Sequence, residues 1–162
     1  MVRVRRIRQE EYAAVGAVTF AAYEPFLTDA EDHYREQLAD VEGRDREAEV
    51  WVAVPDVGDA ILGNVTVCPA GSPWREISRE GEGEFRMLAV APEAQGRGVG
   101  MALAEMVVER FRSDGAGGIA LSSLETMAGA HRIYDRLGFH RDPDRDWSPA
   151  PDVHLIAYSL EL

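Results

Sequence analysis

The stretch Leu88-Ala89-Val90-Ala91-Pro92-Glu93-Ala94-Gln95-Gly96-Arg97-Gly98-Val99-Gly100 decides the fold, because it joins a strand to a helix through a glycine-rich loop. The pattern predicts a strand over residues 84–90 and an amphipathic helix over residues 99–113. A loop in this position presents free backbone N–H groups at the positive end of the helix dipole, which suits a phosphate or pyrophosphate. The glycines alone are equally consistent with a tight turn that binds nothing.

Two familiar nucleotide-binding motifs fit this loop poorly. It lacks the Lys and the Ser or Thr of a P-loop, and predicted antiparallel strands precede it where a dinucleotide fold would open with an N-terminal βαβ unit. The sequence therefore disfavours kinases and dehydrogenases.

A second motif follows in the predicted helix over residues 127–137, where Ala130-His131-Arg132-Ile133-Tyr134-Asp135-Arg136-Leu137-Gly138-Phe139 carries Gly138 as the helix stop. Between the motifs, residues 119–124 are predicted to form a strand. In this order, the two motifs resemble the signatures of the GCN5-related N-acetyltransferases, a Q/R-x-x-G-x-G/A loop after a "LAV-x-P" strand and an "A-x-x-x-Y-x-x-x-GF" helix end. The resemblance is sharp over residues 84–139 and covers only the order of elements elsewhere.

The resemblance implies an α/β (α+β) fold with a mixed, mostly antiparallel central sheet, flanking helices and a splayed parallel strand pair at the cofactor site. The N-terminal half fits this order. It predicts a strand over 2–8, a helix over 10–22 ended by Pro25, a helix from Thr28 or Asp29 to about Leu38 or Val41, a loop at 43–47 and a hairpin of strands 49–54 and 60–67. Residues 69–83 are predicted to be irregular, residues 142–152 to form a mobile loop and residues 153–160 a last strand. The length of 162 residues fits one domain over 1–162.

The resemblance also implies acetyl-CoA, or a close acyl-CoA, as the cosubstrate. The strand residues Leu88, Ala89 and Val90 are expected to pair with the pantetheine arm. The pyrophosphate is expected to lie, mostly through backbone contacts, on Gln95, Gly96, Arg97, Gly98, Val99, Gly100 and Met101. A side chain at Gly98 or Gly100 should crowd the phosphate or the loop dihedral angles, so Gly98→Val is expected to abolish CoA binding.

Two catalytic residues are implied by the resemblance. Tyr134 matches the family tyrosine that protonates the departing CoA thiolate, although an aromatic residue one turn before Gly138 also packs in a core. An ammonium acceptor must lose a proton before its nitrogen attacks, and Glu84 on the central strand is the first candidate base, with Glu82 as the fallback. Glu84 could equally be a solvated residue at the end of its strand.

One position departs from the family pattern. Family members often carry an asparagine seven residues before the tyrosine, where this chain has Met127. The hydroxyls of Ser122, Ser123 and Thr126 could replace that amide, and for Thr126 we favour a role as the cap of the following helix.

The acceptor is expected to be the primary amine of a small molecule that receives an acetyl or other short acyl group by direct attack. Tyr23, Phe26, Tyr34 and Trp74 are candidates for the acceptor pocket wall, and each of them could also serve only in packing. A peptide or protein N-acetyltransferase and a non-catalytic acyl-CoA-binding regulatory module remain as alternatives. A homodimer is left open.

The composition excludes several other functions. The chain has 29 acidic and 17 basic residues and a formal charge of −12, which disfavours nucleic acid and favours a cationic amine, although acidic surfaces often serve only solubility. Cys68 is the only cysteine, so no intrachain disulfide forms, and the four dispersed histidines predict no metal site. No apolar stretch predicts a membrane span or signal peptide, and a cytoplasmic protein is expected.

Overall fold

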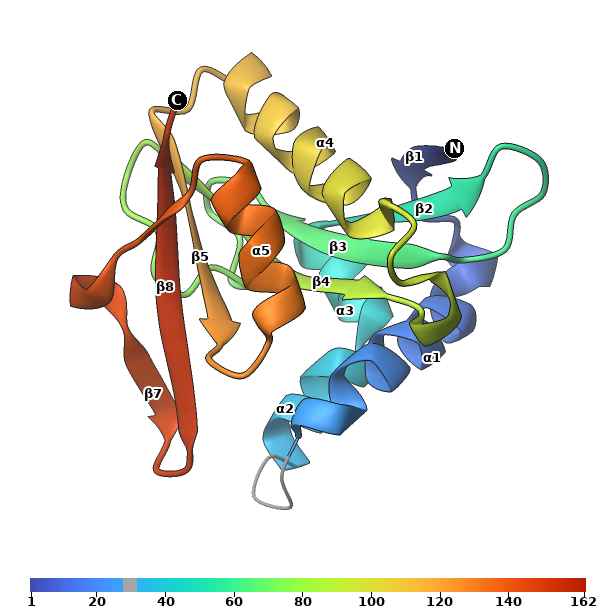
Figure 1. The fold of residues 1–162 in the computed structure, drawn as a ribbon, viewed down its shortest axis with the longest axis horizontal. Helices are drawn as coiled ribbons and strands as arrows, with labels where there is room; N and C mark the ends of the chain where they lie inside the picture. Colours follow the sequence, from blue (N-terminus) through green and yellow to red (C-terminus); the bar gives the residue numbers. More distant parts are fainter. Residues whose placement is uncertain (28–31) are drawn as a thin grey trace.

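The computed structural model describes residues 1–27 and 32–162, and the helix start predicted at Thr28 or Asp29 lies outside them. Its described strands form one sheet in the order β1-β2-β3-β4-β5-β8-β6, with β7 paired to β8 (Figure 1). The strands are β1 (Val2–Arg6), β2 (Glu49–Pro55), β3 (Gly63–Cys68), β4 (Glu82–Val90), β5 (Gly118–Leu124), β6 (His140–Arg141), β7 (Trp147–Ala150) and β8 (Val153–Glu161). The pairing of β4 with β5 is parallel, and the other described pairings are antiparallel.

Helices cover both faces of this sheet (Figure 1). They are α1 (Tyr12–Tyr23), α2 (Asp32–Ala39), α3 (Val41–Glu47), α4 (Val99–Ser113) and α5 (Ala128–Arg136), with short 3-10 turns at Gln9–Glu11, Glu24–Phe26, Pro92–Ala94 and Pro143–Arg145. α4 and α5 lie on one side, and α1, α2 and α3 on the other. None of the helices in the described ranges is long and apolar enough to span a bilayer.

The alternation of side chains along β2 shows why its sequence is almost continuously apolar. Val50, Val52 and Val54 pack with Val15 of α1 and Val41 of α3. Their neighbours Trp51 and Ala53 belong to the larger cluster on the α4 side. A strand that is buried on both faces has no solvent-facing side. Its sequence is therefore a continuous run of apolar residues and does not alternate between apolar and polar residues.

A β-bulge interrupts β4 next to the glycine loop. Asn64 of β3 pairs with Ala89, but Thr66 pairs with Arg86, so Met87 and Leu88 together face the single residue between them on β3. Met87 takes a positive φ of 56°, which is uncommon for a residue with a side chain. The extra residue reverses the side-chain alternation, so that side chains an even number of positions apart across the bulge lie on opposite faces.

The parallel pair separates after only three residue pairs. Glu82 to Glu84 pair with Gly118 to Ala120, and β4 and β5 then diverge, which confirms the expected splayed arrangement. Beyond Glu84, β4 keeps β3 on one edge and has no described strand on the other. The backbone groups on that edge are therefore available to a ligand.

Three boundaries differ from the sequence-based expectation. Residues 43–47, predicted as a loop, lie in α3, because Asp40 caps Gly43 N at 3.0 Å and the buried Arg44 anchors the helix to Thr66 of β3. The predicted mobile loop at 142–152 contains β7, which Trp147 fixes by donating from Nε1 to Ser122 Oγ at 3.1 Å. β3 begins at Gly63 rather than at residue 60.

Candidate active site

A cleft of about 560 Å³ opens between the C-terminal half of β4, the glycine loop and α5. Nine of the ten residues predicted to bind the cofactor line it, namely Leu88, Ala89, Val90, Gln95, Gly96, Gly98, Val99, Gly100 and Met101. Arg97 is the exception. Ala22 and Phe26 from the opposite side of the sheet complete the lining, together with residues of α5.

The start of α4 has the geometry of an anion site. Gly98 is its N-cap residue, in the left-handed conformation with φ 80°, and no side chain caps the helix. The first intrahelical bond runs from Ala102 N to Gly98 O at 3.0 Å, so the N–H groups of Val99, Gly100 and Met101 have no partner within the helix. The first turn carries no acidic residue that would oppose an anion.

Gly100 lines the cleft and also contacts α5. A Cβ atom there would lie 2.7 Å from Ile133 Cδ1 of α5. The glycine therefore allows α5 to approach α4 closely. A Cβ at Gly98 meets no protein atom within 4 Å, so the strain there comes from the dihedral angle alone.

Tyr134 lies on α5, beside the cleft. Its ring is buried among Phe85, Phe139 and Tyr158, with ring centroids 5.4 to 5.9 Å apart. Burial raises the pKa of its hydroxyl, so the group stays protonated. Among the described residues, no hydrogen-bond partner of that hydroxyl is found, which leaves it available to a ligand.

A second cavity of about 30 Å³, lined in part by Tyr134, adjoins the cleft. The two share Leu88, Met127 and Ala130 as wall residues. Tyr23 and Tyr34, predicted to contact the acceptor, both line this small cavity. The hydroxyls of the two tyrosines are hydrogen-bonded to each other, and burial raises the pKa of both.

The other two predicted acceptor residues lie elsewhere. Phe26 lines the large cleft and not the small cavity. Trp74 lines neither cavity; its ring lies under the guanidinium of Arg86, 5.5 Å from the ring centroid. Two charged residues that the sequence reasoning missed, Glu76 and Arg86, do line the small cavity. Glu76 lies in the irregular segment, where no periodic pattern indicates which side chains point inward.

Glu84 does not occupy the position expected of a base. Its side chain is fully buried and lines neither cavity. The prediction assumed a regular strand, in which residues four apart share a face, and the bulge at Met87 places Glu84 and Leu88 on opposite faces. The fallback Glu82 is paired with Arg145 at 2.7 and 2.9 Å, and this arginine lowers its pKa.

Met127, the position that departs from the family pattern, is the N-cap of α5, and it makes no side-chain cap. The prediction that Thr126 caps this helix is therefore wrong. The neighbouring hydroxyls are occupied: Ser122 accepts from Trp147, and Ser123 lies 3.1 Å from His131 Nε2. The methionine side chain instead forms part of the wall between the two cavities.

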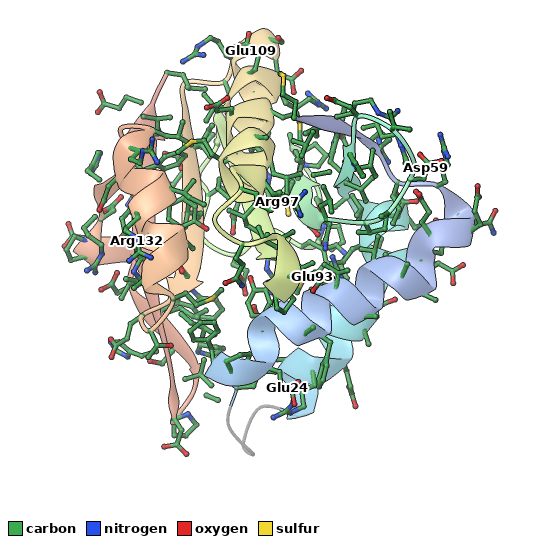
Figure 2. The ribbon with its side chains drawn as sticks, turned by 45° about the vertical axis from the view of Figure 1, so that its right-hand side comes forward. Glu24, Asp59, Glu93, Arg97, Glu109 and Arg132 are labelled. Carbon is green, nitrogen blue, oxygen red and sulfur yellow. The ribbon has the colours of Figure 1, made fainter. Side chains whose placement is uncertain are left out.

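Two arginines of α5 were also missed. Arg132 and Arg136 are exposed, line the large cleft and pair with no carboxylate of the described residues. Figure 2 shows Arg132 on α5, across from the loop that carries Arg97 and Glu93. The signal in the sequence was their spacing of four residues, which places them on one helix face.

Groups of histidine, cysteine and carboxylate side chains that could bind a metal ion are absent from the described parts of the chain. Among the same residues, the charged side chains that line the two cavities are Glu76, Arg86, Arg132 and Arg136.

The fold and the cleft together define a protein of the acetyltransferase class. The chain belongs to the acetyltransferase (GNAT) family, whose model matches residues 3–139.

Comparison with known proteins gives relatives of this family. A mycothiol acetyltransferase of Beutenbergia cavernae is 32% identical over 102 residues, which cover 59% of this chain and 32% of that protein. The chain thus matches about a third of the length of this curated relative. A GNAT acetyltransferase of Staphylococcus aureus Mu50 superposes with a TM-score of 0.76 at 13% identity, over 100% of this chain and 99% of the other. The PaiA N-acetyltransferase of Thermoplasma acidophilum, crystallised with coenzyme A, has a TM-score of 0.73 at 11% identity, over 100% and 99% of the two chains.

Proposed function

We propose that this chain transfers an acetyl group, or another short acyl group, from coenzyme A to the primary amine of a small molecule. The observation that carries the proposal is that the two cavities adjoin. A cleft lined by β4, the glycine loop and α5 shares Leu88, Met127 and Ala130 with a small polar cavity, and Tyr134 lines that small cavity.

Each wall of the cleft suits one part of acetyl-CoA. The unpaired edge of β4 around Leu88 to Val90 offers backbone donors and acceptors to the amides of pantetheine. The N–H groups at the start of α4 suit the pyrophosphate. Arg132 and Arg136 add positive charge to the cleft of a chain whose formal charge is −12.

The reaction needs one proton donor at the sulfur. The amine nitrogen attacks the thioester carbonyl carbon, a C–N bond forms, and the C–S bond breaks. The Tyr134 hydroxyl, which burial keeps protonated, gives its proton to the departing thiolate as the C–S bond breaks, and it takes up the proton that the attacking nitrogen releases. The direct transfer uses no covalent intermediate on the protein.

The size of the second cavity supports a small acceptor. At about 30 Å³ it admits an amino group with few neighbouring atoms, and Tyr23, Tyr34 and Leu155 enclose it. A peptide acceptor would call for an open groove at this place. The position of Tyr134 in the wall of the small cavity, next to the cleft, favours an enzyme over a module that only binds acyl-CoA.

The proposal is tested by incubating the chain with acetyl-CoA and a panel of small primary amines, with lysine-containing peptides as a second panel. Released CoA is measured with a thiol reagent, and products are identified by mass. Cys68 does not disturb this assay, because it is fully buried and burial raises the pKa of its thiol to about 12. We expect amine-dependent release of CoA with small amines. Turnover of the peptides alone would contradict the small-molecule acceptor, and no turnover with either panel would contradict the transferase.

A further inference from the structure

The buried carboxylate of Glu84 binds the loop between β3 and β4. It accepts hydrogen bonds from three consecutive backbone N–H groups, those of Glu76, Ile77 and Ser78, over 2.9 to 3.1 Å. Three backbone donors on one fully buried carboxylate fix the position of the loop, because breaking any of these bonds leaves a polar group unpaired in the interior.

This anchoring determines where the side chain of Glu76 lies. Glu76 lines the small cavity, together with Tyr23, Tyr34 and Tyr134. Its Oε1 lies 3.1 Å from Arg86 Nε, and this ion pair holds the carboxylate in addition to the backbone anchoring by Glu84. Among the described residues, Oε2 accepts no hydrogen bond, so this oxygen is available to a ligand in the cavity.

We propose that Glu76 accepts the proton of the acceptor amine and that Glu84 is the positioning residue that holds it in place. The inference rests on the transferase function proposed above. In the reaction, the ammonium group gives one proton to Glu76 Oε2, and the neutral nitrogen attacks the thioester carbon. As the C–S bond breaks, Tyr134 protonates the leaving sulfur and is reprotonated through solvent by the second proton that the nitrogen releases. A carboxylate and a protonated hydroxyl in the wall of one cavity thus provide the base and the acid.

The surroundings of Glu76 suit a base. Burial raises the pKa of its carboxyl group, the Arg86 guanidinium lowers it, and the negative charge of Glu84 raises it. The other titratable groups whose charges interact with Glu76 are Tyr23, Tyr34 and Cys68. A raised pKa brings a carboxylate nearer to the working range of a general base.

The hydrogen bonds of Glu84 explain why we do not propose this carboxylate itself as the base. Its oxygens are occupied by backbone donors, and it reaches neither cavity. Glu76 has the opposite properties, with one oxygen available and a place in the cavity wall.

The test compares Glu76→Gln, Glu84→Gln and the control Glu82→Gln, which lies on the same strand but pairs with Arg145. For each variant, kcat and KM are measured against pH with the best amine, and the Kd for acetyl-CoA by calorimetry. We expect Glu76→Gln to lose about 10²- to 10⁴-fold in kcat and to lose the acidic limb of the pH profile, with the Kd for acetyl-CoA unchanged. Glu82→Gln should keep both the rate and the limb.

Glu84→Gln separates positioning from general damage to the fold. Loss of its negative charge removes an influence that raises the pKa of Glu76, so the acidic limb should move to lower pH while kcat falls. Glu84→Asp keeps the charge and should leave the limb near its original pH. A folding defect alone would lower the active fraction without moving the limb.

Clear results would overturn the inference. An acidic limb that survives in Glu76→Gln, with kcat within threefold of the wild type, excludes Glu76 as the base. If the acidic limb of the pH profile of Glu84→Gln stays at its original pH or moves to higher pH, the positioning role is excluded. If Glu84→Gln does not fold, Glu76→Gln still decides the base. The wild type is the control for the proposed function, since its failure with every amine would refute the transferase itself.

Discussion

Gly98 offers the sharpest test of the proposed pyrophosphate site at the start of α4. It caps α4 in the left-handed conformation with φ 80°, and a Cβ there would meet no protein atom within 4 Å. Gly98→Ala therefore costs only the backbone strain of a non-glycine residue, about 1–2 kcal/mol. The smaller entropy of the unfolded chain returns about 0.4–1 kcal/mol. The net loss of stability is about 1 kcal/mol, a fall in Tm of roughly 2–4 °C.

Gly115 is a matched control for this substitution. It has φ 77° in the turn after α4, also with no atom within 4 Å of a Cβ, and it does not line the cleft. Gly115→Ala should cost the same stability and leave the cofactor site intact.

The two variants should differ in affinity for acetyl-CoA. In Gly98→Ala, the loop relieves its strain by rotating the N–H groups at the start of α4 away from the pyrophosphate. Losing one charge-assisted hydrogen bond, about 1.5–3 kcal/mol, raises Kd roughly tenfold to hundredfold. Gly98→Val, with a β-branched side chain, should abolish measurable binding. Calorimetric titration and thermal melts measure both effects. A wild-type Kd for Gly98→Ala, or an equal loss in Gly115→Ala, would refute the assignment of the loop.

Three further predictions concern single side chains. Tyr134→Phe should lower kcat by about 10²- to 10⁴-fold and leave the Kd for acetyl-CoA unchanged, as steady-state kinetics and calorimetry will show. Arg132→Gln should weaken acetyl-CoA binding in a salt-dependent manner, whereas Arg97→Gln, outside the cleft lining, should not; equal losses in calorimetry at two salt concentrations would contradict this. Glu82, whose pKa Arg145 lowers, contributes stability above the ordinary carboxyl pKa of 4.5 that is lost as the pH falls. Denaturant unfolding should therefore show a weaker dependence on acidic pH in Glu82→Gln than in the wild type.

The sequence predicted the strand and the helices that surround the large cleft well. The glycine loop, the helix after it and the position of Tyr134 depend on local signals, namely glycines at a helix start and a fixed spacing to the next motif. The splayed strand pair followed from the family resemblance and is confirmed. Local chemistry determines the loop and the helices, so a single sequence contains them, whereas the strand pair was predicted only through the resemblance.

The acceptor half depended on tertiary contacts that the sequence does not display. The bulge at Met87 arises from the pairing with β3, and without it Glu84 would share a face with Leu88. α3 forms because Arg44 is buried against Thr66, despite a glycine in its first turn. Glu76 lies in an irregular segment whose path is set by the carboxylate of Glu84, a contact eight residues away along the chain.

The early separation of β4 and β5 has a thermodynamic consequence. Only three residue pairs join the two strands, and the free edge of β4 faces α5 across the cleft rather than another strand. A ligand that lies on this edge pairs with β4 in the place where β5 has diverged from it. Such a ligand binds the native state alone, so at a hundred times its Kd it adds about 2.7 kcal/mol to the free energy of unfolding. Acetyl-CoA bound at this edge, as proposed, thus stabilises the sheet as well as taking part in the reaction.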